Sequence, residues 1–245
     1  RYQKNQILKM KKKILWLIAA RSGSKSITDK NIKLLGGHPL LSYRIKSVKK
    51  TISDHDLWIT TDSEEYASIA QKYGAEVPFI RPEELSRDTS SSIDVVIHAM
   101  EYAEKLNKEF DYIGLLEPTS PFITSNQLDG AISLLEENNE ALAVVAVRES
   151  RPNKIFIQKE SMFLEELSLN LKQLKNSHRQ EFEKEITPSG GFYISKWSAL
   201  LEKKTFYTSK TLSFEVDEIS GLEIDEPLDW EFAEFIILRK ANEIN

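Results

Sequence analysis

The chain has 245 residues, 40% of them hydrophobic and 29% charged, which is ordinary for a globular protein of one or two domains. Its formal net charge of −5 argues against sequence-independent binding to nucleic acid, which needs a basic field. The chain contains no cysteine, so disulfides, thiolate metal sites and cysteine nucleophiles are excluded.

The first apolar run, residues 14–20, follows three lysines and superficially resembles a signal peptide. Arg21 ends the run after seven residues, far short of the ~20 residues that span a bilayer. We therefore predict a buried strand, no membrane association and a cytoplasmic location. Residues 1–12 are expected to be a flexible N-terminal extension to a domain that covers 13–241.

Short apolar runs and helical patterns alternate along the rest of the chain. The predicted strands are 14–20, 57–61, 77–80, 112–116, 142–147, 190–195 and 211–216. The predicted helices are 39–50, 63–73, 92–106, 125–137 and 228–241. Asp62 and Thr124 each precede a Glu or Gln by three residues, which is the spacing of a helix cap. This order predicts a three-layer α/β fold, with a mostly parallel central sheet, helices on both faces and ligands at the carboxyl ends of the strands.

Residues 150–186 break the alternation. The segment is rich in charge and contains one helical run at 163–174. We interpret it as an insertion that protrudes from the sheet. Its apolar residues need a partner, which is either the parent domain or a second subunit.

The loop after the first strand, ARSGSKSITDKN at 20–31, has the composition of an anion site. Its small residues let backbone N–H groups approach an anion closely: Ser22, Gly23 and Ser24. Three cations follow one another within ten residues: Arg21, Lys25 and Lys30. The loop is neither a Walker A motif nor a GxGxxG motif. It predicts a triphosphate site, and the alternative is a solvated basic turn.

This loop also resembles the acylneuraminate cytidylyltransferases, or CMP-sialic acid synthetases, which activate nine-carbon α-keto acid sugars. Further blocks continue the resemblance in the same order: ITTD at 59–62, YGAEVPFIRPEELSRDTSSS at 73–92, LLEPTSPF at 115–122, SGGFYI at 189–194 and LEIDEPLDW at 222–230. The resemblance implies a nucleotidyltransferase, Rossmann-like fold. It implies that CTP and an acidic keto-sugar, a nonulosonic acid, become a CMP-sugar and pyrophosphate. It also implies a homodimer in which the insertion reaches the partner's site.

The resemblance assigns nucleotide contacts to two parts of the chain. In the first loop these are Arg21, Ser22, Gly23, Ser24, Lys25 and Asn31, with Arg21, Lys25 and Lys30 as the catalytic cations. In the second block they are Arg81, Ser90 and Ser92, which the family places in its cytidine pocket. An alternative for this block is that Ser91 and Asp94 only cap the helix. We expect Asp88 to order the loop and Asp62 to be a helix cap rather than a catalytic group.

The sugar site carries the main departures from the family. Glu117 stands where Gln is common, and an ionised carboxylate accepts hydrogen bonds but does not donate them. It suits a sugar hydroxyl or ammonium group, or it braces the loop. Ser189 replaces Asn, and Thr187 replaces an Arg. The remaining sugar contacts implied by the resemblance are Lys154, Arg179, Gln180, Tyr193, Phe206 and Tyr207. Core packing is the alternative for the last two.

Glu223 and Asp225 alternate in an extended segment, so their side chains point to the same side. Two carboxylates there suit Mg²⁺, which prefers oxygen ligands and bridges to phosphates. The resemblance assigns them this role, whereas Asp229 begins the last helix. Three alternatives stay open for the whole chain: a CMP-Kdo synthetase, another sugar nucleotidylyltransferase, and a non-catalytic nucleotide or sugar sensor.

Overall fold

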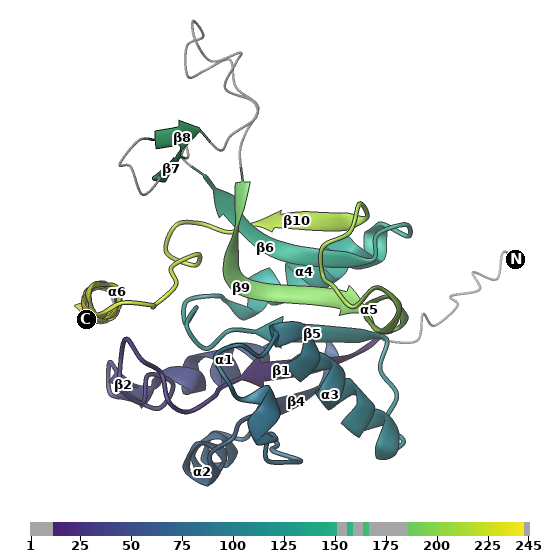
Figure 1. Cartoon of the computed structure of the whole chain (residues 1–245), viewed down its shortest axis with the longest axis horizontal. Helices are drawn as coiled ribbons and strands as arrows, with labels where there is room; N and C mark the ends of the chain where they lie inside the picture. Colours follow the sequence, from purple (N-terminus) through teal and green to yellow (C-terminus); the bar gives the residue numbers. More distant parts are fainter. Residues whose placement is uncertain (1–11, 151–155, 159–163, 167–185, 243–245) are drawn as a thin grey trace, which may run out of the picture.

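A computed structural model describes residues 12–150, 156–158, 164–166 and 186–242 of the chain. Its centre is a six-stranded sheet in the order β10-β6-β9-β5-β1-β4 (Figure 1). The strands are β1 Lys13–Ala19, β4 Asp54–Thr60, β5 Tyr112–Leu116, β6 Ala143–Glu149, β9 Ile186–Lys196 and β10 Thr211–Glu215. β1 pairs in parallel with β4 and β5, and β6 pairs in parallel with β10. β9 is antiparallel to both of its neighbours. The predicted mostly parallel sheet is confirmed.

Helices cover both faces of this sheet, which confirms the three-layer architecture (Figure 1). One face carries α1 Leu40–Val48, α2 Glu64–Lys72 and α4 Ser125–Glu137. The other carries α3 Ser92–Lys105 and α5 Trp197–Lys203. Alternate residues of β1 enter the two cores: Trp16 packs in the first and Leu17 in the second, as the strand period requires.

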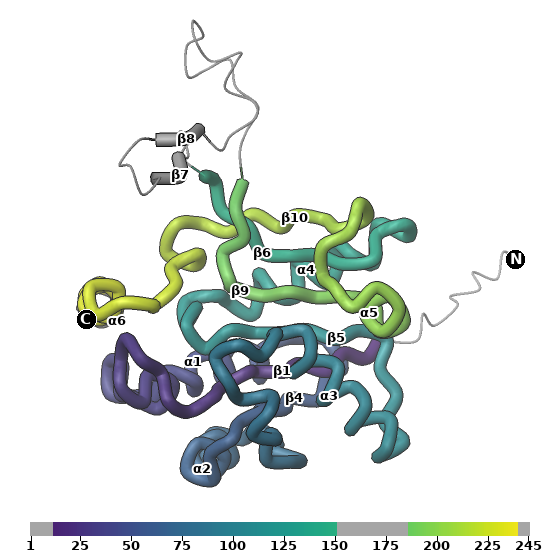
Figure 2. The backbone as a smooth tube through the Cα atoms, in the orientation of Figure 1, coloured from purple at the N-terminus to yellow at the C-terminus, as the bar shows by residue number. Residues whose placement is uncertain are grey.

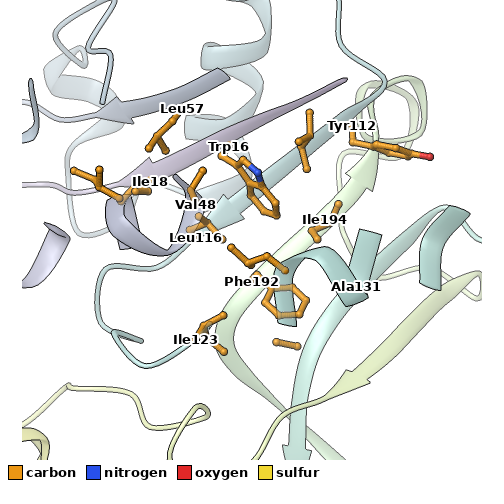
Figure 3. Close-up of a cluster of buried hydrophobic side chains, with 14 of the residues drawn as sticks. Trp16, Ile18, Val48, Leu57, Tyr112, Leu116, Ile123, Ala131, Phe192 and Ile194 are labelled. Carbon is orange, nitrogen blue, oxygen red and sulfur yellow. The ribbon is translucent and has the colours of Figure 1, made fainter. Parts of the chain in front are cut away.

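Figure 3 shows the first core, in which the Trp16 ring lies across the middle of the sheet. A Cβ on Gly114 would lie 2.3 Å from this ring, so the neighbouring strand has room only for glycine there. The Trp16 ring therefore packs directly on the backbone of β5.

A third core joins the segment after β1 to the last helix. The last helix, α6 Pro227–Asn242, packs Trp230 and Ile236 on Ile27 and Leu40. The short hairpin of β2 Leu34–Leu35 and β3 His38–Pro39 lies beside it (Figure 2). This packing brings the loop after β1 next to the segment before α6. Across the described part of the chain, no helix is both long enough and apolar enough to cross a membrane.

Of the two helix caps predicted from the sequence, the structure confirms the one at α4 and contradicts the one at α2. Thr124 and Gln127 form the predicted capping box of α4. At α2 the prediction of Asp62 was wrong, because Ser63 is the cap and its hydroxyl accepts from the Tyr66 N–H at 3.3 Å. Asp62 is therefore available for another contact.

Two predicted elements also differ. Residues 77–80 form no strand: Glu76 makes one isolated bridge to Trp58, and Pro78 then removes a donor beside an edge strand. Within the predicted helical run 163–174, Leu164–Glu166 is a strand, β8, paired with β7 Phe156–Gln158. The rest of that run lies outside the described residues. The short helices η1 Glu83–Leu85 and α5 were not predicted.

Candidate active site

A cavity of about 230 Å³ opens at the carboxyl ends of β1, β4 and β5. Its wall combines the loop after β1, the segment between β4 and α3, and the loop after β5. Eight of the predicted site residues line it: Arg21, Ser24, Lys30, Asn31, Arg81, Ser90, Ser92 and Glu117. The wall also contains residues that the sequence did not indicate, including Arg87 and Thr119.

The loop after β1 is held from both sides. Asp62 accepts hydrogen bonds from the backbone N–H of Ser22 at 2.7 Å and from its hydroxyl at 2.8 Å. The Asn31 amide donates to the Arg21 carbonyl at 3.0 Å and so ties the end of the loop to its start. Gly23 has φ +71°, a conformation that favours glycine. Asp62 is therefore a loop anchor, in place of the helix cap that we predicted.

Two cations of the loop share one carboxylate. Asp88 accepts from Arg21 Nη1 at 2.7 Å, and it also pairs with the Lys25 ammonium. Hydrogen bonds from Lys25 and Arg21 lower the pKa of Asp88. The Lys25 side chain is 81% exposed, so this contact can exchange with solvent or with another anion. Asp88 joins the first loop to the second block, as expected from the sequence.

Lys30 connects the loop after β1 to the segment before α6. Its buried ammonium donates to the Ile224 carbonyl at 2.8 Å and to Asp225 Oδ1 at 3.2 Å. The Ser26 hydroxyl donates to the Asp225 carbonyl. The basic loop and the predicted metal-binding acids, which are almost 200 positions apart, therefore lie in one place.

Arg81 is buried in the wall of the cavity. Its Nε donates to Thr60 Oγ1 at 3.0 Å, and its Nη2 donates to the Thr60 carbonyl. Burial lowers its pKa to about 10, which leaves the guanidinium charged at neutral pH. In the same block Ser91 caps α3, which was the alternative prediction for this residue. Ser90 and Ser92 line the cavity.

Glu223 and Asp225 form a close acidic pair. Burial raises the pKa of Glu223, and the negative charge of Asp225 raises it further. A Cβ on Gly190 would lie 2.6 Å from Glu223 Oε2, so this glycine, at φ +60°, leaves room for the carboxylate. Asp229, in the first turn of α6, accepts from the backbone N–H of Asp225 at 2.9 Å and fixes the segment.

These residues fit Mg²⁺ in their chemistry, because they offer two oxygen donors beside a cavity lined by cations. Among the described residues, no group of three or more acidic or histidine side chains is arranged to hold a metal. A magnesium ion held here would therefore need phosphate or water oxygens as well, which is the usual arrangement for this ion.

Glu117 lines the cavity from the loop after β5. Burial raises its pKa to about 7, the charge of Glu223 adds to the rise, and the Arg44 guanidinium opposes it. Arg44 is fully buried and donates from Nη2 to the Gly191 carbonyl at 2.7 Å. Arg44 was not predicted from the sequence, although a charged residue one turn after Leu40 on the apolar stripe of a helix was a usable signal.

Most of the predicted sugar contacts that the structure describes do not line the cavity. Tyr193 packs against Phe206 and Tyr207, with ring centroids 5.6 and 6.2 Å apart, and none of the three lines the cavity. Phe206 is buried, which favours its packing interpretation, whereas Tyr207 is 52% exposed. Ser189 is also buried. Lys154, Arg179 and Gln180 lie outside the described residues.

The fold and the cavity define a class. A mostly parallel sheet presents a small-residue loop with three cations, a buried arginine and an acidic pair at its carboxyl edge, which is the arrangement of a nucleotide-binding α/β enzyme of the nucleotidyltransferase type.

Comparisons with known proteins refine this class. Residues 15–241 match the cytidylyltransferase family. The chain is 32% identical over 235 residues to the N-acylneuraminate cytidylyltransferase of Escherichia coli O18:K1:H7, with 95% of this chain and 54% of that protein covered. It is 30% identical over 225 residues to the CMP-N,N'-diacetyllegionaminic acid synthase of Legionella pneumophila, with 91% and 95% covered.

Among solved structures, a CMP:2-keto-3-deoxy-manno-octonic acid synthetase complexed with CTP has a TM-score of 0.69. It is 15% identical, and 93% of this chain and 99% of that one are covered, which shows a shared fold. The chain belongs to the cytidylyltransferase family, as its sequence motifs indicated. It spans about half the length of the Escherichia coli relative.

Proposed function

We propose that the protein transfers the cytidylyl group of CTP to a nonulosonic acid, a sialic acid or a relative such as legionaminic or pseudaminic acid. The products are the CMP-sugar and pyrophosphate. The observation that carries this proposal is the contact between Lys30 and Asp225, because it sets the proposed metal-binding acids beside a cation that lines the cavity. The family and its relatives that act on nine-carbon keto-sugars support the substrate class.

In this proposal the triphosphate lies along the loop after β1. Backbone N–H groups near Gly23 and the charges of Arg21, Lys25 and Lys30 neutralise its oxygens. Arg21 and Lys25 leave their present partner, Asp88, when phosphate oxygens replace it. The nucleoside occupies the side of the cavity formed by Arg81, Ser90 and Ser92.

Glu223 and Asp225 would hold Mg²⁺, and the bound ion supplies charge neutralisation at phosphate oxygens. Gly190 gives Glu223 its room, and Asp229 fixes the backbone of Asp225. The anomeric hydroxyl of the sugar forms a bond to the α-phosphorus while the bond to the β-phosphate oxygen breaks in line. Pyrophosphate leaves, and the proton of the attacking hydroxyl passes to solvent water. Catalysis is positioning and electrostatic stabilisation, so no side-chain nucleophile is needed.

A substrate panel tests the reaction. Pyrophosphate release is measured with CTP or UTP, with and without Mg²⁺, against sialic, legionaminic and pseudaminic acids and the eight-carbon acid Kdo. We expect turnover with CTP, Mg²⁺ and at least one nine-carbon acid. Turnover with Kdo alone would instead identify a CMP-Kdo synthetase, and CTP binding without pyrophosphate release would identify a sensor.

We also propose that the protein is a homodimer in which residues 150–186 contribute to the interface. The charged insertion with its apolar run in the sequence supports this. Sedimentation of the full chain and of a variant lacking residues 155–180 tests it. We expect a dimer for the first and a monomer for the second, and an unchanged dimer would refute the role of the insertion.

A further inference from the structure

Asp29 closes the turn that carries Lys30 and Asn31. The Asp29 carbonyl accepts hydrogen bonds from the backbone N–H groups of Ile32 and Lys33, each at 2.9 Å. Lys30 and Asn31 are the central residues of this turn, and both line the cavity. The backbone conformation of Asp29 therefore sets where these two side chains meet the site.

This conformation is one that few side chains adopt. The φ of Asp29 is +49°, in the left-handed region, where residues other than glycine are uncommon. Aspartate and asparagine enter the region more readily than other side chains. Such a conformation persists where the surrounding structure holds it. The side chain that contacts Asp29 is therefore of interest for the geometry of the turn.

This contact is made by Tyr66 of helix α2. The Tyr66 hydroxyl donates to Asp29 Oδ1 at 3.3 Å. The Tyr66 side chain is 1% exposed and packs in the first core, and a buried tyrosine hydroxyl needs a hydrogen-bond partner. Burial raises the pKa of Tyr66, and the charge of Asp29 and the hydrogen bond to it raise this pKa further. The hydroxyl therefore remains a donor at neutral pH.

The start of α2 thus holds the loop after β1 at two points. Asp62, which directly precedes the helix cap, binds Ser22 near the beginning of the loop. Tyr66, in the first turn of the helix, binds Asp29 near the end of the loop. Neither Tyr66 nor Asp29 lines the cavity, so both act on a ligand through the residues of the turn.

We propose that Tyr66 is a positioning residue: through Asp29 it holds Lys30 in the orientation that binds the triphosphate of CTP. In this orientation the Lys30 ammonium contacts the Ile224 carbonyl and Asp225. Loss of the Tyr66 hydroxyl removes a support of the turn and displaces the ammonium, and a displaced charge neutralises phosphate less well. The inference rests on the proposed function for the identity of the ligand.

Four variants test the pair: Tyr66→Phe, Asp29→Gly, Asp29→Asn and the double variant Tyr66→Phe/Asp29→Gly. Glycine adopts a positive φ freely, so Asp29→Gly removes the acceptor without straining the turn. Asparagine also enters this region and still offers an oxygen to Tyr66, so Asp29→Asn should rescue most of the loss. Tyr112→Phe is the control, because Tyr112 is buried in the same core but lies at the start of β5, away from the carboxyl ends of the strands (Figure 3).

We expect Tyr66→Phe and Asp29→Gly each to weaken equilibrium binding of CTP with Mg²⁺ about tenfold, as loss of a hydrogen bond to a charged group does. The KM for CTP should rise by the same factor, and the KM for the sugar should stay nearly unchanged. A loss of stability alone would lower the rate with the folded fraction and change neither KM. The double variant should be no worse than the worse single variant, because the two residues act as one unit.

Three outcomes overturn the proposal: unchanged CTP binding in Tyr66→Phe, additive losses in the double variant, and a loss in Asp29→Asn as large as in Asp29→Gly.

A measurement without nucleotide or turnover separates this inference from the proposed reaction. The ¹⁵N ammonium resonance of the buried Lys30 is identified as the signal that Lys30→Met removes. We expect this signal to shift in Tyr66→Phe, which changes no charge, and to stay in place in Tyr112→Phe. An unmoved signal in Tyr66→Phe overturns the positioning role whatever the activity. If the signal and CTP binding respond as expected but no keto-sugar acid is turned over, the proposed reaction is refuted and the positioning role stands.

Discussion

The phosphate side of the cavity and its Glu117 side are built in opposite ways. On the phosphate side, exposed loop cations are satisfied within the chain, as when Arg21 and Lys25 share Asp88. On the Glu117 side, the loop after β5, strand β9 and helix α1 carry the buried residues Ser120, Ser189 and Arg44, and several of their polar atoms have no hydrogen-bond partner among the described residues. Exchangeable ion pairs suit a charged tail that must bind and leave, whereas rigid buried groups suit discrimination between sugars.

The largest effect that would test this contrast is expected at Lys30, the one cation of the loop that is both buried and bonded to the acidic segment. Lys30→Met should lower turnover roughly 10²–10³-fold, because a preorganised donor is lost where charge develops. It should also lower the free energy of unfolding by about 1–3 kcal/mol, because the Ile224 carbonyl loses its donor. Pyrophosphate release and thermal unfolding measure the two effects. Lys72→Met, at an exposed position of α2, is the control, and wild-type turnover in Lys30→Met would remove Lys30 from the site.

The second effect concerns the acidic pair. Gly190→Ala should raise the Mg²⁺ concentration for half-maximal binding about tenfold, because the added Cβ displaces the Glu223 carboxylate. Calorimetric titration with Mg²⁺, or Mn²⁺ as a spectroscopic probe, measures this without turnover. Gly37→Ala is the matched control: it has φ +82° and the same backbone penalty of roughly 1–2 kcal/mol, but its Cβ meets open space. Equal metal binding in both variants would contradict the role of Gly190.

A smaller effect is expected at Lys25, which is far more exposed than Lys30. Lys25→Ala should reduce turnover about tenfold, the value of one charged hydrogen bond to phosphate. Its melting temperature should stay within experimental error of the wild type, because an exposed ion pair contributes little stability. If unfolding changed and turnover did not, Lys25 would be a structural residue only.

The smallest effect is expected at Asp88, and it tests whether the ion pairs on the phosphate side of the cavity exchange with the ligand. Asp88→Asn removes the carboxylate that competes with phosphate for Arg21 and Lys25, so it should tighten CTP binding about threefold. Equilibrium binding of CTP at fixed ionic strength measures the change, with Asp129→Asn as a remote acidic control. Weaker binding in Asp88→Asn would mean that Asp88 orders the loop more than it competes with the ligand.

Local patterns predicted most of the fold. Strand and helix periods located the central strands, and Thr124 with Gln127 located a helix start, because each depends on neighbours in sequence. The run at 77–80 misled because a short apolar stretch can line a loop as well as a strand. Asp62 misled because its partner, Ser22, is 40 positions away.

The candidate site was predictable in its cations and acids, which lie in short motifs. Its supporting contacts were not. The pairing of Lys30 with Asp225 depends on the third core, and the hydrogen bond from Arg44 to the Gly191 carbonyl depends on the packing of α1 on the sheet. A sequence shows which residue types are present, but only tertiary packing decides which unlike charges meet.

The antiparallel course of β9 has a consequence for how such an enzyme can diversify. Glu149 at the end of β6 stands opposite Ile186 at the start of β9, so the chain departs and returns at adjacent rungs. An excursion between such rungs can lengthen or change at little cost in closure entropy, because that cost grows slowly with loop size. The returning strand then passes directly into the Ser189–Gly191 bend. The segment between β6 and β9 can therefore change in length or sequence while the residues of the neighbouring cavity keep their positions.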